Sequence, residues 1–323
     1  MAILAFLNGI FLRIVGLLLS LIMVWTVPPS RAVTFEAKDP DNLRLQVSVF
    51  ADIHMQGFFW SQFRLPMQSF DQLTRSLRDI SGAAQPIDAL VLLGDNTMNG
   101  QSLEYIWLYG LLSRYNRARE TFVVMGNHDL SLNTMAPRTA IDRHNFFWQS
   151  YDGTRATEAY YSRVIGGYTF IALAGEGPAD GNVTNPSADE RIISDEQIAW
   201  LAQTMENAPE GKPIFVFVHQ HVNTGFPLPE FFPRAAEIRE ILEQYDNVFV
   251  FNGHWHSLPM LYSLENGVHY VNAPTIHSHG YGEHDIAGEG LQLEVYDDRV
   301  IIRGRNFMAG EWMDEYFVVE LVQ

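Results

Sequence analysis

Short runs of apolar and β-branched residues recur along the chain, and each run ends at a polar loop. The clearest runs lie at 45–51, 89–93, 121–125, 214–218 and 248–251. Runs of this length are typical of strands covered on both faces of a parallel sheet. Apolar residues at helical spacing lie between or beside these runs, at 69–80, 103–119, 140–151, 195–207 and 233–245. The alternation predicts an α/β fold in which helices cover the faces of parallel strands.

Further strands are predicted outside this regular alternation. A hairpin across Gly166 and Gly167 would join strands at 159–164 and 168–174. From Leu261 onward the apolar residues alternate in short runs, at 269–272, 291–296, 300–303 and 316–321. Alternation of this kind predicts antiparallel strands, which we expect to complete a second sheet.

Residues 1–32 form a separate apolar segment. The run from Ile14 to Val27 has the length of a signal-peptide core, Arg13 precedes it, and Ser30 and Ala32 are small residues at the spacing of a cleavage site. The longer run from Gly9 to Val27 nearly spans a bilayer if the Arg13 side chain reaches the interface, so an uncleaved membrane anchor is the alternative. The cleavage-like site favours a signal peptide, and a buried core helix is disfavoured because no polar face recurs at helical spacing. We therefore expect an exported protein that touches a membrane only through this segment.

Charge and cysteine content narrow the possible functions. The chain has 21 Lys and Arg against 38 Asp and Glu, a net charge of -17, so it would repel long nucleic acid. A small phosphate ester remains a possible substrate if metal ions supply local positive charge. There is no cysteine, so thiol nucleophiles, thiolate metal sites and disulfides are excluded. Any metal ion must be held by nitrogen and oxygen.

Residues with metal-binding side chains follow five of the predicted strands. In chain order they are Asp52 and His54, Asp95, Asn127 and His128, His219, and His254 and His256. In α/β folds, ligands bind at the carboxyl ends of the strands. Carboxylates, imidazoles and an amide oxygen together suit two divalent cations such as Mn, Fe or Zn, and the ligand types do not choose among these metals.

The order of these motifs resembles that of the calcineurin-like metallophosphoesterase superfamily, and the pattern is most similar to its cyclic-nucleotide-phosphodiesterase-like and general phosphohydrolase members. The matching motifs are D-x-H at 52–54, G-D-x(4)-G at 94–100, G-N-H-D at 126–129, a lone His219, and G-H-x-H at 253–256. The resemblance covers roughly residues 45 to 260. It implies a sandwich of two mixed β-sheets flanked by helices, and we assign residues 33–323 to one such domain.

The resemblance also implies a role for each motif residue. The first metal ion would be held by Asp52, His54 and His256, the second by Asn127, His219 and His254, and Asp95 would bridge the two. A water shared by the metal ions would attack phosphorus in line. His128 would not bind metal; it would stabilise the developing charge or protonate the leaving group.

Departures from the family pattern bear on the substrate. Met98 and Asn99 stand where protein serine/threonine phosphatases carry Asp and Arg, and Met98 also replaces the tyrosine of purple acid phosphatases. We expect hydrolysis of a small phosphate monoester or diester, with a cyclic nucleotide as one alternative. A non-catalytic scaffold on the same fold is the alternative from another class, and it is disfavoured because every ligand position is filled.

Some residues near these motifs have no assigned role in the pattern. Asp129 is interpreted either as a support for the ligands or as an exposed loop acid. His221 is interpreted either as an ordinary loop residue, which is favoured, or as a residue that lines the site. A histidine-rich loop at 277–284 would either bind substrate or another metal or be a plain loop, and the nearby glycines and proline favour the plain loop. The aromatic cluster at 58–60 would either stack on a substrate base or pack as core or lid.

Overall fold

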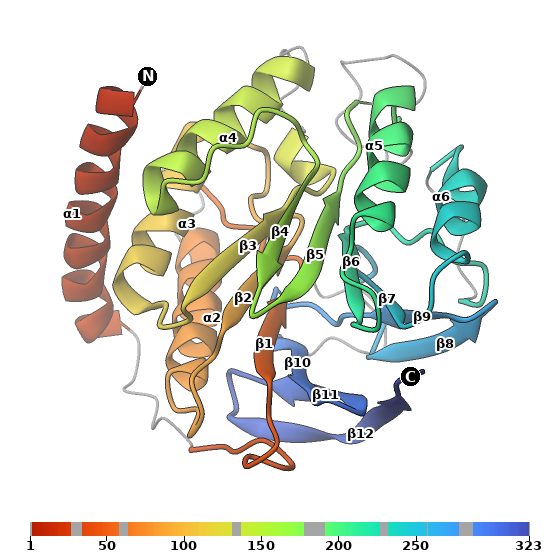
Figure 1. Cartoon of the computed structure of the whole chain (residues 1–323). Coiled ribbons are helices and arrows are strands. Elements are labelled where there is room, and N and C mark those ends of the chain that lie inside the picture. Colours follow the sequence, from red (N-terminus) through yellow and green to blue (C-terminus); the bar gives the residue numbers. More distant parts are fainter. Residues whose placement is uncertain are drawn as a thin grey trace.

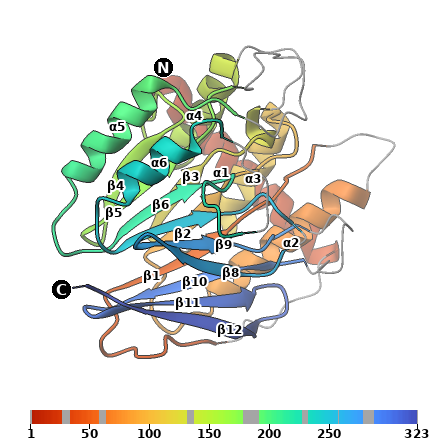
Figure 2. The ribbon, with the colours of Figure 1, turned by 90° about the vertical axis from the view of Figure 1, so that its right-hand side faces the viewer.

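Two six-stranded sheets pack face to face, with helices on their outer sides (Figures 1 and 2). The computed structural model describes residues 2–26, 34–57, 64–130, 137–177, 191–226, 232–256, 258–277 and 287–322. The interface between the sheets is apolar, with Val47 and Phe122 of one sheet in the same buried cluster as Phe170 and Phe217 of the other. The predicted sandwich of two mixed sheets is therefore confirmed.

The first sheet has the strand order β12-β11-β10-β1-β2-β3. Its strands are β1 (Leu45–Phe50), β2 (Ala89–Leu93), β3 (Glu120–Val124), β10 (Glu289–Val295), β11 (Arg299–Asn306) and β12 (Glu311–Glu320). Strands β1, β2 and β3 are parallel, whereas β10 runs antiparallel to β1. The carboxyl ends of the three parallel strands therefore lie at one edge of the sheet.

The second sheet has the order β4-β5-β6-β7-β9-β8. Its strands are β4 (Tyr161–Ile165), β5 (Tyr168–Leu173), β6 (Ile214–Val218), β7 (Val248–Asn252), β8 (Leu261–Glu265) and β9 (Val268–Asn272). Only β8 and β9 of the C-terminal strands complete this sheet. The expectation that all of them do so is wrong, because β10 pairs with the open edge of β1, where Ser48 Oγ donates a buried hydrogen bond of 2.7 Å to Gln292.

Helices cover the outer faces of both sheets (Figure 1). The helical elements are α1 (Ala2–Thr26), α2 (Arg64–Ile80), α3 (Ser102–Tyr115), η1 (His128–Leu130), α4 (Pro137–Asp152), α5 (Asp195–Glu206) and α6 (Ala235–Leu242). Helix α3 ends four residues earlier than predicted, because Asn116 takes an extended conformation and its side-chain oxygen accepts a hydrogen bond from the Ala118 amide.

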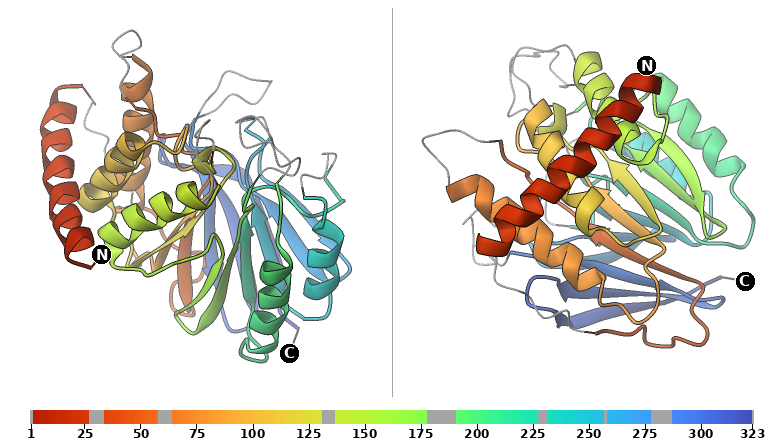
Figure 3. Two further views of the ribbon diagram at one scale, coloured as in Figure 1. Left: turned by 90° about the horizontal axis from the view of Figure 1, so that it is seen from above. Right: turned by 90° about the vertical axis from the view of Figure 1, so that its left-hand side faces the viewer.

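The apolar N-terminal segment is helix α1, which lies alongside α3 and α4 on the outside of the helical layer (Figure 3). Leu12 and Val15 on its inner side are buried. Among the described residues, no helix combines the length and the apolar character that a bilayer crossing requires. The residues of the predicted cleavage site, 30–32, lie outside the described part of the chain.

Candidate metal centre

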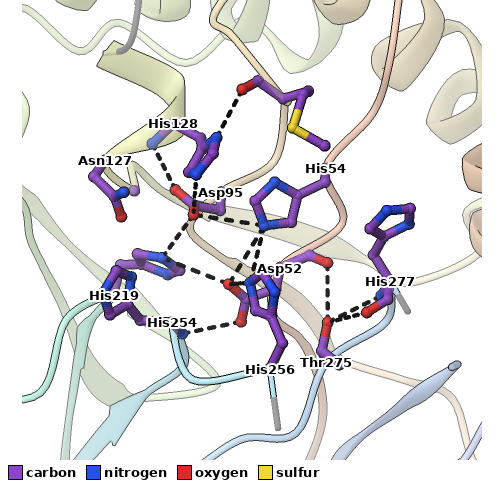
Figure 4. A network of polar contacts seen from close by, with 12 residues as sticks. Asp52, His54, Asp95, Asn127, His128, His219, His254, His256, Thr275 and His277 are labelled. Carbon is purple, nitrogen blue, oxygen red and sulfur yellow. Dashed lines mark hydrogen bonds and ion pairs between the residues drawn. The ribbon is translucent and has the colours of Figure 1, made fainter. Parts of the chain in front are cut away.

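All eight residues singled out at the strand ends gather in one place (Figure 4). They are Asp52, His54, Asp95, Asn127, His128, His219, His254 and His256. They follow β1, β2 and β3 of the first sheet and β6 and β7 of the second. The site therefore lies where the carboxyl ends of parallel strands from both sheets meet, as expected for an α/β fold.

One group of ligand atoms comprises side-chain atoms of Asp52, His54, Asp95 and His256, all within 4.8 Å of one another. His256 Nε2 lies 2.9 Å from Asp52 Oδ1 and 3.0 Å from His54 Nε2. His54 Nε2 in turn lies 3.6 Å from Asp95 Oδ2. Two imidazole nitrogens that converge on two carboxylates form a donor set that fits a divalent cation.

A second group comprises Asp95, His219 and His254, also within 4.8 Å. His219 Nδ1 donates to the Leu93 carbonyl at 2.8 Å, so Nε2 points inward, where it lies 3.2 Å from Asp95 Oδ2. A hydrogen bond of this kind commonly fixes the tautomer of a metal-binding histidine. Asp95 belongs to both groups, so its carboxylate is shared between them.

The backbone at the site adopts strained conformations. Asp52, His54, Asp95 and His254 have φ angles of 53°, 45°, 48° and 75°. Non-glycine residues rarely adopt this left-handed region, and such outliers cluster at functional sites. The other described non-glycine residues with positive φ are Asn247 and Asn266, and asparagine tolerates this conformation better than most residues.

Two glycines allow the loops to approach this closely. A Cβ atom added at Gly126 would lie 2.1 Å from Asp95 Oδ1, and one added at Gly94 would lie 2.5 Å from the His219 ring. Gly94 also has a φ angle of +82°. The glycines of the G-D and G-N-H-D motifs are therefore required by packing around Asp95 and His219.

Electrostatic interactions keep both carboxylates ionised. Burial alone would raise the pKa of Asp95, but His219 and His128 hold it below the ordinary range. For Asp52, burial is likewise outweighed, mainly by His256, and the pKa falls well below its usual value. Both oxygen donors are thus available to a cation at neutral pH.

The imidazoles divide into two kinds. Burial lowers the pKa of His54 to about 4, and burial together with His219 lowers that of His254 to about 3. Burial would also lower the pKa of His219, but Asp95 and Asp52 raise it to about 9. His54 and His254 are therefore neutral at pH 7, as metal ligands must be, whereas a cation has to displace a proton from His219.

Asp129 supports the site from within and is not an exposed loop acid. It is 1% exposed. Its Oδ1 accepts hydrogen bonds from the amide and the hydroxyl of Thr97 at 3.0 and 2.8 Å, and its Oδ2 accepts from the Gly126 amide at 3.0 Å and from the Asn96 amide at 3.2 Å. One carboxylate thus ties the loop that carries Asp95 to the loop that carries Asn127 and His128.

Two further buried residues contact the site, and sequence analysis did not assign either a role in it. Arg191 Nη2 donates to the backbone carbonyl of Asn127 at 3.1 Å. The His277 ring centroid lies 5.8 Å from that of His54, and its Nδ1 lies 2.8 Å from Gln72 Oε1. No motif marks Arg191, and His277, the first residue of the histidine-rich loop, has a buried side chain.

Other expectations near the site are resolved only in part. His221 is fully buried. The aromatic cluster at 58–60 and the histidines at 279 and 284 lie outside the described residues.

Several solved structures share the fold. A dimetal phosphatase from Danio rerio aligns with a TM-score of 0.59 and 14% identity, covering 87% of this chain and 100% of that one. Purple acid phosphatase PPD1 from yellow lupin (Lupinus luteus) seeds aligns with a TM-score of 0.58 and 12% identity, and the alignment covers 85% of this chain and 53% of that one. GAP50, the anchor in the inner membrane complex of Plasmodium, aligns with a TM-score of 0.56 and 13% identity, and the alignment covers 86% of this chain and 89% of that one. At these identities the likeness shows the fold alone.

Sequence comparison identifies the family. No curated protein matches the chain. The family model for calcineurin-like phosphoesterases matches residues 45–258, which is more than half of the chain and contains every residue of the candidate metal centre. The chain therefore belongs to the calcineurin-like phosphoesterase family.

Proposed function

We propose that the protein is a metal-dependent hydrolase of small phosphate esters. The observation that carries this proposal is the convergence of two ligand groups that share Asp95. Their nitrogen and oxygen donors suit two divalent cations of the Mn, Fe or Zn type. When bound, such cations would supply an activated water as nucleophile and neutralise the charge of the phosphoryl oxygens.

His128 is the residue best placed to act on the substrate directly. Its Nδ1 donates to the Met98 carbonyl at 2.8 Å, so Nε2 is the ring atom available to a substrate. Nε2 lies 4.0 Å from Asp95 Oδ2, and the side chain is 36% exposed, whereas His54 and His219 are fully buried. A protonated His128 in this position can donate to the leaving oxygen or to a phosphoryl oxygen.

The chain's own residues also hold the reacting groups in place. The His128 amide donates to Asp95 Oδ1 at 2.8 Å, which leaves Oδ2 facing His54 and His219. The His254 amide donates to Asp52 Oδ2 at 3.0 Å, which leaves Oδ1 facing His256. Each carboxylate thus has one oxygen fixed by the backbone and one directed at imidazoles, so the donor atoms are preorganised.

The test is hydrolysis of p-nitrophenyl phosphate and bis-p-nitrophenyl phosphate by the full chain loaded with Mn²⁺. Asp95→Asn removes the shared carboxylate and is expected to abolish turnover. Asp142→Asn is the matched control, because Asp142 is an exposed acid on α4 that pairs with Arg138. Its activity should equal that of the unmodified protein.

The substrate ratio then assigns the reaction. Faster hydrolysis of the diester supports a phosphodiesterase, and cyclic nucleotides would be the next substrates to assay. Faster hydrolysis of the monoester supports a phosphatase. If metal is bound but neither ester shows Asp95-dependent turnover, the hydrolase proposal is overturned and a non-catalytic scaffold on this fold takes its place.

A further inference from the structure

Helix α1 is part of the packed helical layer. The Cβ atom of a residue replacing Gly16 would lie 2.2 Å from the Gly110 carbonyl oxygen on α3, and one at Gly9 would lie 2.5 Å from the Ser150 carbonyl oxygen on α4. The backbone of α1 therefore touches both helices directly, as its position in Figure 3 shows. Only glycine allows this approach, so α1 has a specific docking face.

The opposite side of α1 is apolar and open to solvent. Its exposed large side chains are Phe6, Leu7, Ile10, Phe11, Ile14, Leu17 and Leu18. At roughly 100° per residue these positions form one continuous face, with Arg13 at its edge. Their exposed fractions range from 43% at Ile10 to 69% at Phe6. A contiguous exposed apolar surface marks an interaction site.

Arginines lie beside the edge of this apolar face that carries Arg13. A cavity of about 660 Å³ beside α1 is lined by Arg13, Arg119 and Arg163, and a neighbouring one of about 360 Å³ is lined by Arg13 and Arg155. The first cavity is also lined by two acidic residues, Glu120 and Asp152, and the second by Asp152 alone. Arginines therefore outnumber acidic residues in both cavities.

Part of this positive charge is not neutralised by neighbouring acids. Arg119 pairs with Asp88, and Arg163 pairs with Glu120. Arg13 and Arg155 are exposed and form no ion pair with a described carboxylate. In a chain with a net charge of -17, this local excess of arginine indicates an anionic partner.

We propose that this surface, the outward face of α1 with its flanking arginines, binds an anionic lipid bilayer, with α1 lying in the plane of the membrane. The apolar side chains would enter the boundary between headgroups and acyl chains, and the arginines would meet lipid phosphates. A second copy of the chain fits less well, because a twofold contact across α1 would bring the same arginines toward one another. The proposal is independent of the hydrolase activity.

Binding is measured by cosedimentation of the full chain with phosphatidylcholine vesicles that contain or lack phosphatidylglycerol. We expect binding that requires phosphatidylglycerol and weakens with salt. Ile10→Asp combined with Ile14→Asp should abolish it. Val164→Asp is the matched control, since Val164 is an apolar residue of β4 that is 62% exposed, and this variant should bind like the unmodified protein.

The arginines are tested separately. Arg155→Gln should weaken vesicle binding about fivefold, which is the effect of one arginine near an anionic surface. Arg75→Gln on α2 is the control, because Arg75 pairs with Asp71 and lines neither cavity. An equal loss of vesicle binding in both variants, or no loss of binding in Arg155→Gln, would contradict the role of the flanking arginines. Circular dichroism and thermal unfolding, measured alongside, verify that each variant is folded.

The orientation of α1 is tested with labels, because the chain contains no cysteine and a single introduced one is therefore unique. Spin labels at Leu7→Cys, Ile14→Cys and Leu18→Cys should report equal depths in the bilayer if α1 lies flat. Depths that change steadily along the series would indicate a spanning helix and overturn the proposal. Vesicle binding that does not require anionic lipid would also overturn the proposal. The proposal would likewise fail if the mass of the protein isolated from cells showed that α1 had been removed.

Discussion

Asp95 shows how much of the candidate centre rests on single side chains. One of its oxygens accepts the His128 amide, and the other faces both His54 and His219. The carboxylate also fills the space beside Gly126, where an added Cβ would lie 2.1 Å from Oδ1. The roles of the other residues of the centre are tested by substitutions that leave Asp95 in place.

Replacing His128 should slow hydrolysis without removing metal. For His128→Asn we expect turnover to fall about 10²- to 10⁴-fold, the usual contribution of a general acid. The loss should be larger for phenyl phosphate than for p-nitrophenyl phosphate, since a poor leaving group depends more on protonation. Steady-state kinetics and metal analysis measure both effects. His269→Asn on β9, where His269 bonds to Tyr262, is the control. Equal losses with both esters would rule out proton donation.

Replacing Asp129 should weaken metal binding through the loops that it joins. In Asp129→Asn, an amide nitrogen must face the amide groups of Thr97 or of Asn96 and Gly126. We expect metal affinity to fall about 10- to 100-fold, as for other residues that position ligands. Titration calorimetry with Mn²⁺ measures this, and Asp142→Asn again provides the matched control. Unchanged affinity together with reduced thermal stability would mean that Asp129 serves the fold alone.

At the scale of elements, the local pattern of apolar and polar residues predicted the strands and the polar side chains that follow them. It did not predict which strands pair with one another. The apolar runs and the polar residues after them are local information, so the strands that carry Asp52 and His256 could be placed from sequence. The partner of β10 could not, because Ser48 and Gln292 are 244 residues apart. The burial of Asp129 and the docking of α1 likewise depend on contacts distant in sequence.

The loop after β6 is held to the β8–β9 hairpin by one carboxylate. Glu265 accepts hydrogen bonds from Ser263 Oγ at 2.7 Å, from the amide and hydroxyl of Thr224 at 3.0 and 2.8 Å, and from the Gly225 amide at 3.0 Å. Burial would raise the pKa of Glu265, but these donors, with Ser263 foremost, lower it to about 2. This loop follows directly after His219 and His221, so the hairpin supports one side of the candidate centre.

Glu265 should therefore stabilise the fold in a pH-dependent way. Because its pKa is lower in the folded chain than the ordinary 4.5, its contribution is complete above pH 4.5 and is lost as the pH falls through about 2. We expect Glu265→Gln to lower the melting temperature at pH 7 and the difference to shrink below pH 4.5. Thermal unfolding across this pH range measures the effect. Glu240→Gln, which changes an exposed acid on α6, is the matched control. A difference in melting temperature that stays constant at every pH would contradict the pH-dependent role of Glu265.

At the scale of the whole molecule, the candidate centre joins the two sheets. Its eight residues follow β1, β2 and β3 of one sheet and β6 and β7 of the other. A cation held between them would connect the two halves of the sandwich at one edge. The apolar interface between the sheets holds them together elsewhere.

Removing metal should therefore loosen this edge first. We expect chelation to lower the melting temperature and to raise amide hydrogen exchange in the loops after these five strands, while the interior of the sheets stays protected. At a free metal concentration of 100 times Kd, rebinding would restore about 2.7 kcal/mol. Calorimetry and exchange mass spectrometry measure these changes. Asp95→Asn should show no metal-dependent shift, and a shift as large as in the unmodified chain would place the metal elsewhere.

The left-handed backbone at Asp52, His54, Asp95 and His254 also has an evolutionary consequence. Glycine at any of these positions would relieve backbone strain of about 1 kcal/mol or more. Relief of backbone strain alone would therefore favour glycine at all four positions, and selection for chemistry opposes that change. A lineage released from that chemistry is expected to lose these residues early.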